Sequence, residues 1–345
     1  MIEIGYALSS EEHSPSDLVA NASAAEEAGF TFALISDHFH PWIDRQGQSP
    51  FVWSVLGAIA GATEKLVVGT GVTCPMIRIH PAIIAQAAAT TAALMPDRFF
   101  LGLGSGENLN EHILGTVWPE WDVRAEMLEE SIEVIRALWT GEVTSHRGRH
   151  YTVQNARIYS LPEKLPPIYL AAGGKKAVRQ AARIGDGLIG TGPDADLLKR
   201  YEEAGGGGPR YGQMTMCWAD SEQKAKRTAL EWWPTAAIHG EATQELPNPA
   251  HFQQLTESVT EDQIAEVISC GPDPEPHLAK IREYIDAGYD HVYLHQVGPD
   301  QAGFLRFAER ELLPALKPAT AGARTRPAPR RTPDDRPRQA ARPDR

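Results

Sequence analysis

The stretch ISDHFHPW, residues 35–42, places a carboxylate, two imidazoles and an indole within six positions, directly after an apolar run. An imidazole titrates near pH 6.5, so it can take up or release a proton close to neutral pH. The segment therefore predicts proton-transfer chemistry, with His38 and His40 as the candidate groups.

The same two histidines form a His-x-His pair, which some barrel hydrolases use to bind a metal ion. Such sites recruit further ligands from other strand ends, where this chain offers only Glu107 and an isolated His295. The sequence therefore does not favour a metal site. The alternative for each histidine is a hydrogen-bonded loop imidazole, which fits His40 better than His38.

The elements that must position these residues follow from the apolar periodicity, in which strand-like runs alternate with helical patterns. Parallel strands need helical crossovers, so the pattern predicts an α/β fold, a (β/α)8 TIM barrel with insertions. Chemistry in such barrels lies at the carboxyl ends of the strands, where we expect the polar and glycine-rich segments to converge. The expected strands cover residues 2–7, 32–37, 66–72, 98–106, 167–172, 187–192, 213–219 and 291–297.

Local signals place the ends of some helices. Ser16 is typical of a helix N-cap, Gly29 of the residue that ends a helix, and Pro81 of a first helical turn. The glycines of GLGSGEN, residues 102–108, do not form a dinucleotide fingerprint. In AAGGKK, residues 171–176, the glycines open onto a helix, which indicates either an anion site or an ordinary turn.

Charge and composition limit the partners. The net charge is −12 at pH 7, and residues 319–345 carry eight arginines and three aspartates, which leaves −17 on residues 1–318. We expect that body to repel nucleic acid. Residues 318–345 lack large apolar side chains, so they are predicted to be a disordered Arg/Pro-rich tail, either solvated or binding RNA or anionic lipid.

Residues 1–317 are accordingly predicted to form one domain. The sequence shows no signal peptide and no apolar run of membrane-spanning length, so we expect a cytoplasmic protein without a membrane partner. Its three cysteines, Cys74, Cys217 and Cys270, are widely spaced and are expected to be reduced.

Several motifs together resemble one family: SDHFHPW, GTGVTCP, GLGSGENLNE, RAEMLEESIEVIRALWTGE and YLAAGGKK. They are similar to the luciferase-like (bacterial luciferase-like) TIM barrels that use the deazaflavin coenzyme F420, and most of all to the F420-dependent glucose-6-phosphate dehydrogenase group. The resemblance runs from residue 1 to about residue 317. It implies an oxidoreductase that transfers a hydride between an alcohol or carbonyl substrate and C5 of the deazaflavin.

The resemblance also implies roles for individual residues. His38 would take the hydroxyl proton, Glu107 would act as an acid beside the deazaflavin, and Trp42 would shield the substrate side. A cis peptide bond would join Gly71 to Val72. The residues implied to bind the coenzyme are Asp37, Gly71, Val72, Ser105, Gly106, Glu107, Asn110, Ala171, Ala172, Gly173 and Gly174.

The substrate end departs from the family pattern. The sugar-phosphate enzymes hold their substrate's phosphate with a threonine and three cations, and here Thr191 is present. Asp194 stands at one cation position, and Thr243 and Val267 align with the other two. A poorly neutralised phosphate dianion binds weakly, so we expect a small-molecule alcohol or carbonyl other than glucose 6-phosphate.

Two other classes stay open: an FMN-dependent monooxygenase of the luciferase-like superfamily, and a non-catalytic protein that binds F420. The family's habit implies a homodimer.

Overall fold

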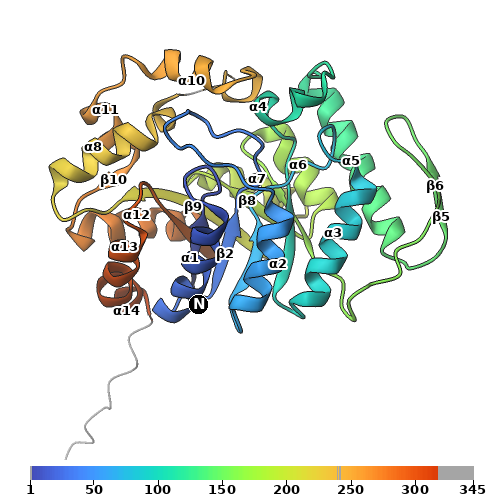
Figure 1. Cartoon of the computed structure of the whole chain (residues 1–345), viewed down its shortest axis with the longest axis horizontal. Helices are drawn as coiled ribbons and strands as arrows, with labels where there is room; N and C mark the ends of the chain where they lie inside the picture. Colours follow the sequence, from blue (N-terminus) through green and yellow to red (C-terminus); the bar gives the residue numbers. More distant parts are fainter. Residues whose placement is uncertain (1, 239, 241, 318–345) are drawn as a thin grey trace, which may run out of the picture.

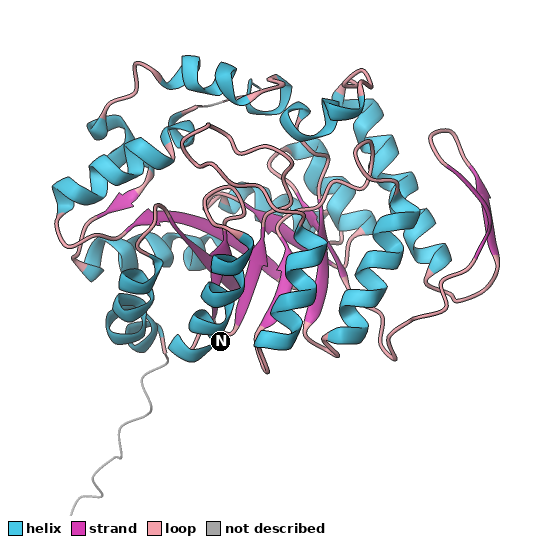
Figure 2. Ribbon diagram, in the orientation of Figure 1, coloured by secondary structure: helices cyan, strands magenta, loops and turns pink. Residues whose placement is uncertain are grey.

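The computed structural model describes residues 2–238, 240 and 242–317, which form a closed barrel of eight parallel strands surrounded by helices (Figures 1 and 2). The strand order is β11-β1-β2-β3-β4-β7-β8-β9, and β9 pairs with β11 to close the ring. The barrel strands are β1 (Glu3–Leu8), β2 (Phe32–Ile35), β3 (Val67–Thr70), β4 (Phe99–Leu103), β7 (Ile168–Ala171), β8 (Gly187–Gly190), β9 (Arg210–Cys217) and β11 (His291–Gln296). All eight expected strands are present, so the predicted (β/α)8 barrel is confirmed.

The surrounding helices cover the outside of the strands and bury their apolar faces against them (Figure 2). They are α1 (Pro15–Ala28), α2 (Val52–Ala62), α3 (Pro81–Leu94), α5 (Trp121–Leu138), α6 (Lys175–Ile184), α7 (Ala195–Glu203), α8 (Glu222–Trp232), α12 (Pro274–Ala287) and α13 (Gln301–Phe307). The chain continues through η3 (Ala308–Leu312) into α14 (Leu313–Leu316). No helix in the described part of the chain is both long and apolar enough to cross a lipid bilayer.

Aromatic rings fill the barrel interior near the amino ends of the strands. Phe32, Phe100, Tyr169, Tyr211 and Tyr293 form one buried cluster with Leu34 and Ile189. Glycine makes room for them, because a Cβ at Gly5 would lie 2.3 Å from the ring of Phe32 and a Cβ at Gly69 would lie 2.0 Å from the ring of Phe100. The packed rings close the barrel at this level, which leaves the carboxyl ends of the strands for chemistry.

Two insertions interrupt the barrel. The hairpin of β5 (Thr144–Arg147) and β6 (Thr152–Ala156) projects from one side and was not predicted from the sequence (Figure 1). The second insertion lies at the carboxyl end of the strands, on the same side as α4 (Asn108–Glu111) and η1 (His112–Leu114). It contains η2 (Pro234–Ala237), α9 (Ala242–Glu245), α10 (Pro249–Thr256), α11 (Glu261–Val267) and β10 (Ser269–Cys270).

The helix ends agree with the sequence signals in part. Gly29 ends α1 with φ +98°, and Pro81 occupies the first turn of α3, as predicted. The N-cap of α1 is Ser14 rather than Ser16, and its hydroxyl accepts from the N–H of Asp17. The reason is Pro15, whose fixed φ suits the first helical position and moves the helix start two residues earlier. All three cysteines are free thiols, as expected.

Candidate active site

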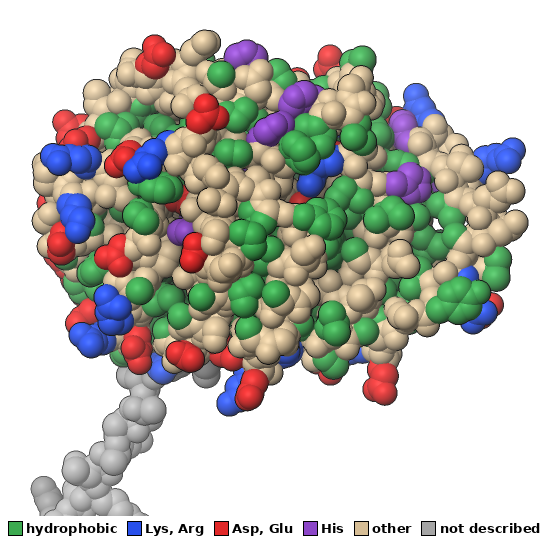
Figure 3. All heavy atoms as spheres, in the orientation of Figure 1, with side chains coloured by type: hydrophobic (Ala, Val, Ile, Leu, Met, Phe, Trp, Pro, Cys, Tyr) green, Lys and Arg blue, Asp and Glu red, His purple; other side chains and the backbone are tan. Residues whose placement is uncertain are grey.

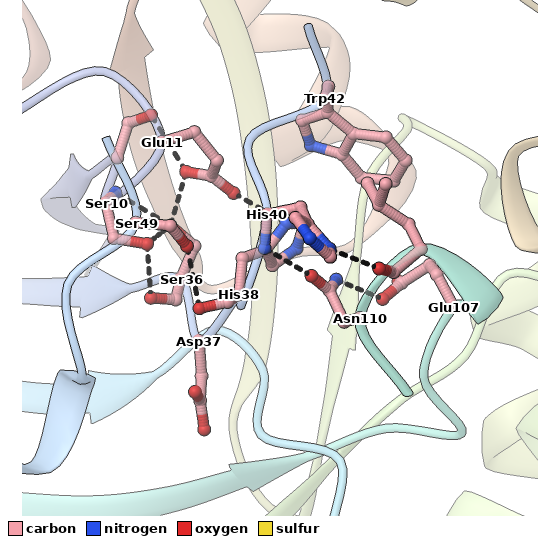
Figure 4. Close-up of polar contacts among 12 residues, drawn as sticks. Ser10, Glu11, Ser36, Asp37, His38, His40, Trp42, Ser49, Glu107 and Asn110 are labelled. Carbon is pink, nitrogen blue, oxygen red and sulfur yellow. Dashed lines mark hydrogen bonds and ion pairs between the residues drawn. The ribbon is translucent and has the colours of Figure 1, made fainter. Parts of the chain in front are cut away.

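His38 follows β2 and lies beside a buried glutamate from the end of β1. Its Nδ1 is 3.2 Å from Oε1 of Glu11, within ion-pair distance but without the alignment of a hydrogen bond. The other oxygen of Glu11 accepts from the hydroxyls of Ser36 at 2.6 Å and Ser9 at 3.0 Å (Figure 4). The loop after β1 thus presents one well-bonded carboxylate to the imidazole.

The surroundings of Glu11 favour its charged form. Burial alone would raise the pKa of Glu11, but the nearby His38 imidazole and the Ser36 hydroxyl outweigh burial and lower it overall. An ionised carboxylate beside Nδ1 favours the tautomer that carries its proton there, which leaves the lone pair on Nε2. His38 can then accept a proton through Nε2.

An aromatic and aliphatic cluster packs next to His38. The ring of Trp42 lies 5.1 Å from the His38 ring and 5.2 Å from the ring of Phe252 in α10, measured between centroids. Ile43 and Leu109 are buried in the same cluster. The second insertion therefore contributes an apolar wall beside the imidazole, which limits access of water.

His40 has a different environment from His38, although only one residue separates them. Its Nδ1 lies 2.8 Å from the carbonyl oxygen of Leu109, and its ring stacks on His112 at 5.8 Å. The prediction that His40 is a hydrogen-bonded loop imidazole is confirmed. Within the described residues, no group of three or more His, Cys, Asp or Glu side chains is arranged to hold a metal ion.

Glu107 and Asn110 connect the end of β4 to the histidine loop. Oδ1 of Asn110 accepts from the backbone N–H groups of Phe39 at 2.9 Å and His40 at 3.2 Å. The Asn110 side-chain nitrogen lies 3.5 Å from Oε2 of Glu107, which is partly exposed. These bonds hold the histidine loop and the carboxylate of Glu107 in one assembly (Figure 4).

Asp37 points away from His38 and belongs to a buried charged network (Figure 4). Its two carboxylate oxygens bond to Arg78 at 2.8 Å and to the hydroxyl of Thr73 at 2.7 Å. Glu111 in turn accepts from the N–H groups of Ile77 and Arg78. Asp37 therefore fixes the loops after β2 and β3 to each other.

Glycine lets the ends of β3 and β4 approach closely. The peptide bond between Gly71 and Val72 is cis, as predicted. A Cβ at Gly104 would lie 2.6 Å from the Val72 side chain, and a Cβ at Gly106 would lie 2.6 Å from the sulfur of Cys74. Ser105, between these glycines, is half-buried. The strand ends thus pack closely, with the Val72 side chain and the Cys74 thiol in the space that a larger residue would need.

The AAGGKK segment lies where β7 passes into α6. Gly174 is the N-cap of α6 and supplies no side chain, and both Gly173 and Gly174 are exposed. Ala171 is half-buried, whereas Ala172 is buried and its N–H donates to Ile189 in the barrel. The exposed glycines and the uncapped first turn of α6 can accept an anion, but the N–H of Ala172 is already engaged.

Thr191 and Asp194 lie farther along the strand ends. Thr191 is exposed after β8, and its carbonyl oxygen lies 3.4 Å from the hydroxyl of Tyr284. Asp194 is the N-cap of α7, where its carboxylate accepts from the N–H of Leu197 at 2.9 Å. Asp194 thus caps α7, a role that was not predicted from the sequence.

Three buried charged residues at the site were missed from the sequence: Glu11, Arg78 and Glu111. Glu11 follows strand β1 in the run SSEEH, and that position at a strand end was the available signal. Arg78 and Glu111 carry no such signal, because their partners come from other loops.

Residues 1–291 match the family model described as luciferase-like monooxygenase, and the chain belongs to this luciferase-like family. Within it the chain falls among the F420-dependent oxidoreductases. The F420-dependent glucose-6-phosphate dehydrogenase of Microbacterium testaceum is 36% identical over 328 residues, 92% of this chain and 98% of the relative. The enzyme of that name from Nakamurella multipartita is 36% identical over 331 residues, 92% of this chain and 97% of the relative.

Solved structures agree with this assignment. An F420-dependent secondary alcohol dehydrogenase in complex with an F420-acetone adduct superposes with a TM-score of 0.85 at 28% identity, over 92% of this chain and 99% of that one. The F420-dependent tetrahydromethanopterin reductase of Methanopyrus kandleri shares the fold, with a TM-score of 0.74 at 21% identity over 92% and 99% of the two chains. The expected coenzyme, F420, is confirmed as that of the relatives.

Proposed function

We propose that the protein uses coenzyme F420 to interconvert an alcohol and the corresponding carbonyl compound. The observation that carries this proposal is the pairing of His38 with the buried Glu11. When bound, the coenzyme accepts or donates a hydride at C5 of its deazaflavin. In the oxidative direction, Nε2 of His38 takes the hydroxyl proton of the substrate, while Glu11 stabilises the imidazolium that forms.

The residues present fit such a coenzyme. Gly104 packs against the half-buried side chain of Val72, which would back the coenzyme ring at the ends of β3 and β4. The exposed N-terminus of α6 at Gly173 and Gly174 offers unpaired N–H groups to a phosphate. The residues proposed to hold the coenzyme remain Gly71, Val72, Ser105, Gly106, Glu107, Asn110, Ala171, Ala172, Gly173 and Gly174. Asp37, whose carboxylate is bonded to Arg78 and Thr73, would support the loops of this site rather than contact the coenzyme.

Two further side chains complete the proposed machinery. Glu107 is partly exposed and anchored through Asn110, so it can hold a proton beside the coenzyme ring. Trp42 packs on His38 and on Phe252, which supports a role in excluding water from the reacting carbon.

The proposed substrate is an unphosphorylated alcohol, such as a secondary alcohol, or its ketone. The wall beside His38 is apolar, formed by Trp42, Phe252 and their neighbours. Asp194 places a carboxylate at a position where the family resemblance implies a cation. Both features disfavour binding of a phosphate dianion, although the relatives are named glucose-6-phosphate dehydrogenases.

A fluorescence titration of the purified protein with F420 and with FMN tests the coenzyme. We expect much tighter binding of F420, because strand-end motifs around the barrel match F420 users. Equal affinity, or a preference for FMN, would favour the monooxygenase alternative.

The substrate is tested by following deazaflavin absorbance while unphosphorylated secondary alcohols, ketones and glucose 6-phosphate are supplied in turn. We expect turnover with members of the first two groups and very little with glucose 6-phosphate. Fast oxidation of glucose 6-phosphate would contradict the substrate assignment but leave the coenzyme assignment intact.

A homodimer is also proposed, joined through the outer face of α2 and α3. Neither helix contains a charged residue. More than half of the surface is exposed for Ile83 and Leu94 in α3 and for Phe51, the residue before α2. Figure 3 shows hydrophobic side chains gathered over these helices. An uncharged apolar face of this kind is typical of a surface that a partner covers. The proposed location of the protein is the cytoplasm.

A further inference from the structure

A second buried carboxylate and imidazole lie next to the first pair. Oε2 of Glu12 is 3.0 Å from Nε2 of His295, near the end of β11, and both side chains are at most 2% exposed. The other oxygen of Glu12 accepts from the N–H of Gly298 at 2.8 Å. Trp233 packs edge-on against the His295 ring at 4.4 Å, and Thr215 approaches Nδ1 at 3.5 Å.

The order of strands explains why two adjacent glutamates reach different partners. Strand β1 lies between β2 and β11, so the loop after β1 can bond to both neighbours. Ser10 bonds to Ser36 beyond β2, and Glu12 bonds to His295 in β11. Glu11, which faces His38, is held between these two anchors.

The hydrogen bond between Glu12 and His295 is fully buried, and a buried carboxylate that has lost its hydration is weak evidence of net stabilisation. Such a pair does fix geometry, because each partner needs the other in place. Here that fixed geometry concerns the loop that carries the partner of the proposed base.

We propose that Glu12 and His295 are a positioning pair, which fixes the loop of residues 9–13 and so holds the Glu11 carboxylate against His38. Neither residue touches the reacting atoms in this assignment. The effect of the pair on kcat rests on the proposed function, whereas its effect on the order of the loop of residues 9–13 does not.

Other titratable groups surround the pair and must be considered in any pH profile. His13 lies on the same loop as Glu12, and Asp17 lies in the helix that follows, α1. Tyr6 lies in β1 and Cys217 in β9. Burial lowers the pKa of His13 and raises that of Cys217 to beyond the working range, so both are neutral near pH 7. Burial likewise keeps Tyr6 neutral.

The first test compares His295→Leu with His295→Gln, whose amide can still donate to Glu12. Hydrogen–deuterium exchange of residues 9–13 should rise in His295→Leu and stay near the unaltered protein in His295→Gln. This measurement needs no coenzyme and no substrate. Unchanged exchange in His295→Leu would overturn the proposal even if the protein proves to be an F420-dependent oxidoreductase.

The second test is kinetic. We expect kcat to fall about 10- to 100-fold in His295→Leu, with the Kd for F420 within about twofold, because a misplaced base costs rate rather than binding. His295→Gln should restore kcat to within about threefold. The acid limb of kcat/KM should also move to lower pH in His295→Leu, because the displaced Glu11 carboxylate no longer stabilises the imidazolium of the base. General destabilisation does not produce such a shift.

His277→Leu is the matched control, because His277 is also a buried histidine, bonded to Ser269 and Gly271 outside the site. It should lose stability without a change in the pH profile. If His295→Leu does not fold, His295→Asn replaces it, since its shorter amide cannot reach Glu12. Wild-type kcat in a folded His295→Leu or His295→Asn variant, or an equal loss of kcat in His277→Leu, would overturn the proposal.

Discussion

At the scale of single residues, His38 and His40 differ in what surrounds them rather than in their type. Glu11 faces Nδ1 of His38, whereas a backbone carbonyl faces Nδ1 of His40. A carboxylate partner stabilises an imidazolium much more than a carbonyl does, so only His38 is equipped as a base.

His38→Ala should therefore lower kcat by about 10²–10⁴-fold, the usual contribution of a general base, with F420 binding largely retained. His40→Ala should lower kcat far less and act mainly on stability, because its ring holds the turn at Leu109. Steady-state kinetics and thermal unfolding of both variants check this. A larger kinetic loss in His40→Ala would reverse the assignment of the base.

The lowered pKa of Glu11 makes a separate prediction about stability. A carboxyl whose pKa is lower in the folded than in the unfolded state stabilises the fold above its unfolded value, and that contribution is lost as pH falls through the folded value. The free energy of unfolding should thus fall more steeply below pH 4.5 in the unaltered protein than in Glu11→Gln. Denaturant unfolding at several pH values measures the difference, with exposed Glu163→Gln as the control that should match the unaltered protein.

The sequence predicted the residues that follow a strong apolar run, such as His38 and Glu107, because strand ends converge in any barrel. It did not predict the partners. Glu11 and Arg78 resemble solvated charges in the sequence, since their burial depends on loops that only the closed barrel brings together.

At the scale of elements, hydrophobic periodicity was sufficient for the eight strands, and turn chemistry was sufficient for several helix ends. The β5–β6 hairpin was missed because its strands are short and mostly polar, with Val153 as the one buried apolar residue in β6. The role of Asp194 was missed because a cap and a ligand-contacting carboxylate look alike in sequence.

Asp194 belongs to α7 as its N-cap, so changing it has two effects. Asp194→Lys should lower the KM for glucose 6-phosphate without a matching change in kcat, because it replaces an anion with a cation away from the reacting carbon. It should also cost about 1 kcal/mol of stability through the lost cap. Asp194→Asn keeps the cap and removes the charge, so its stability should stay near that of the unaltered protein. An unchanged KM for glucose 6-phosphate in Asp194→Lys would show that the phosphate does not approach α7.

At the scale of the whole molecule, the acidic surface of the body is interrupted by the uncharged face of α2 and α3 (Figure 3). Charged side chains elsewhere keep copies of the chain apart in solution, whereas this face offers apolar contact without desolvating a charge. The predicted tail, residues 318–345, lies outside the described residues, and the apolar face proposed for association belongs to the barrel.

The homodimer is tested by a charge placed on this face. Ile83→Glu should convert a species of twice the chain mass into a monomer, because a carboxylate in an apolar interface loses its hydration without gaining a partner. Val117→Glu is the control, since Val117 is 84% exposed in another region and its change should leave the mass unaltered. Light scattering coupled to size-exclusion chromatography measures both. A monomeric unaltered protein would refute the dimer, and a dimer that survives Ile83→Glu would move the interface away from α2 and α3.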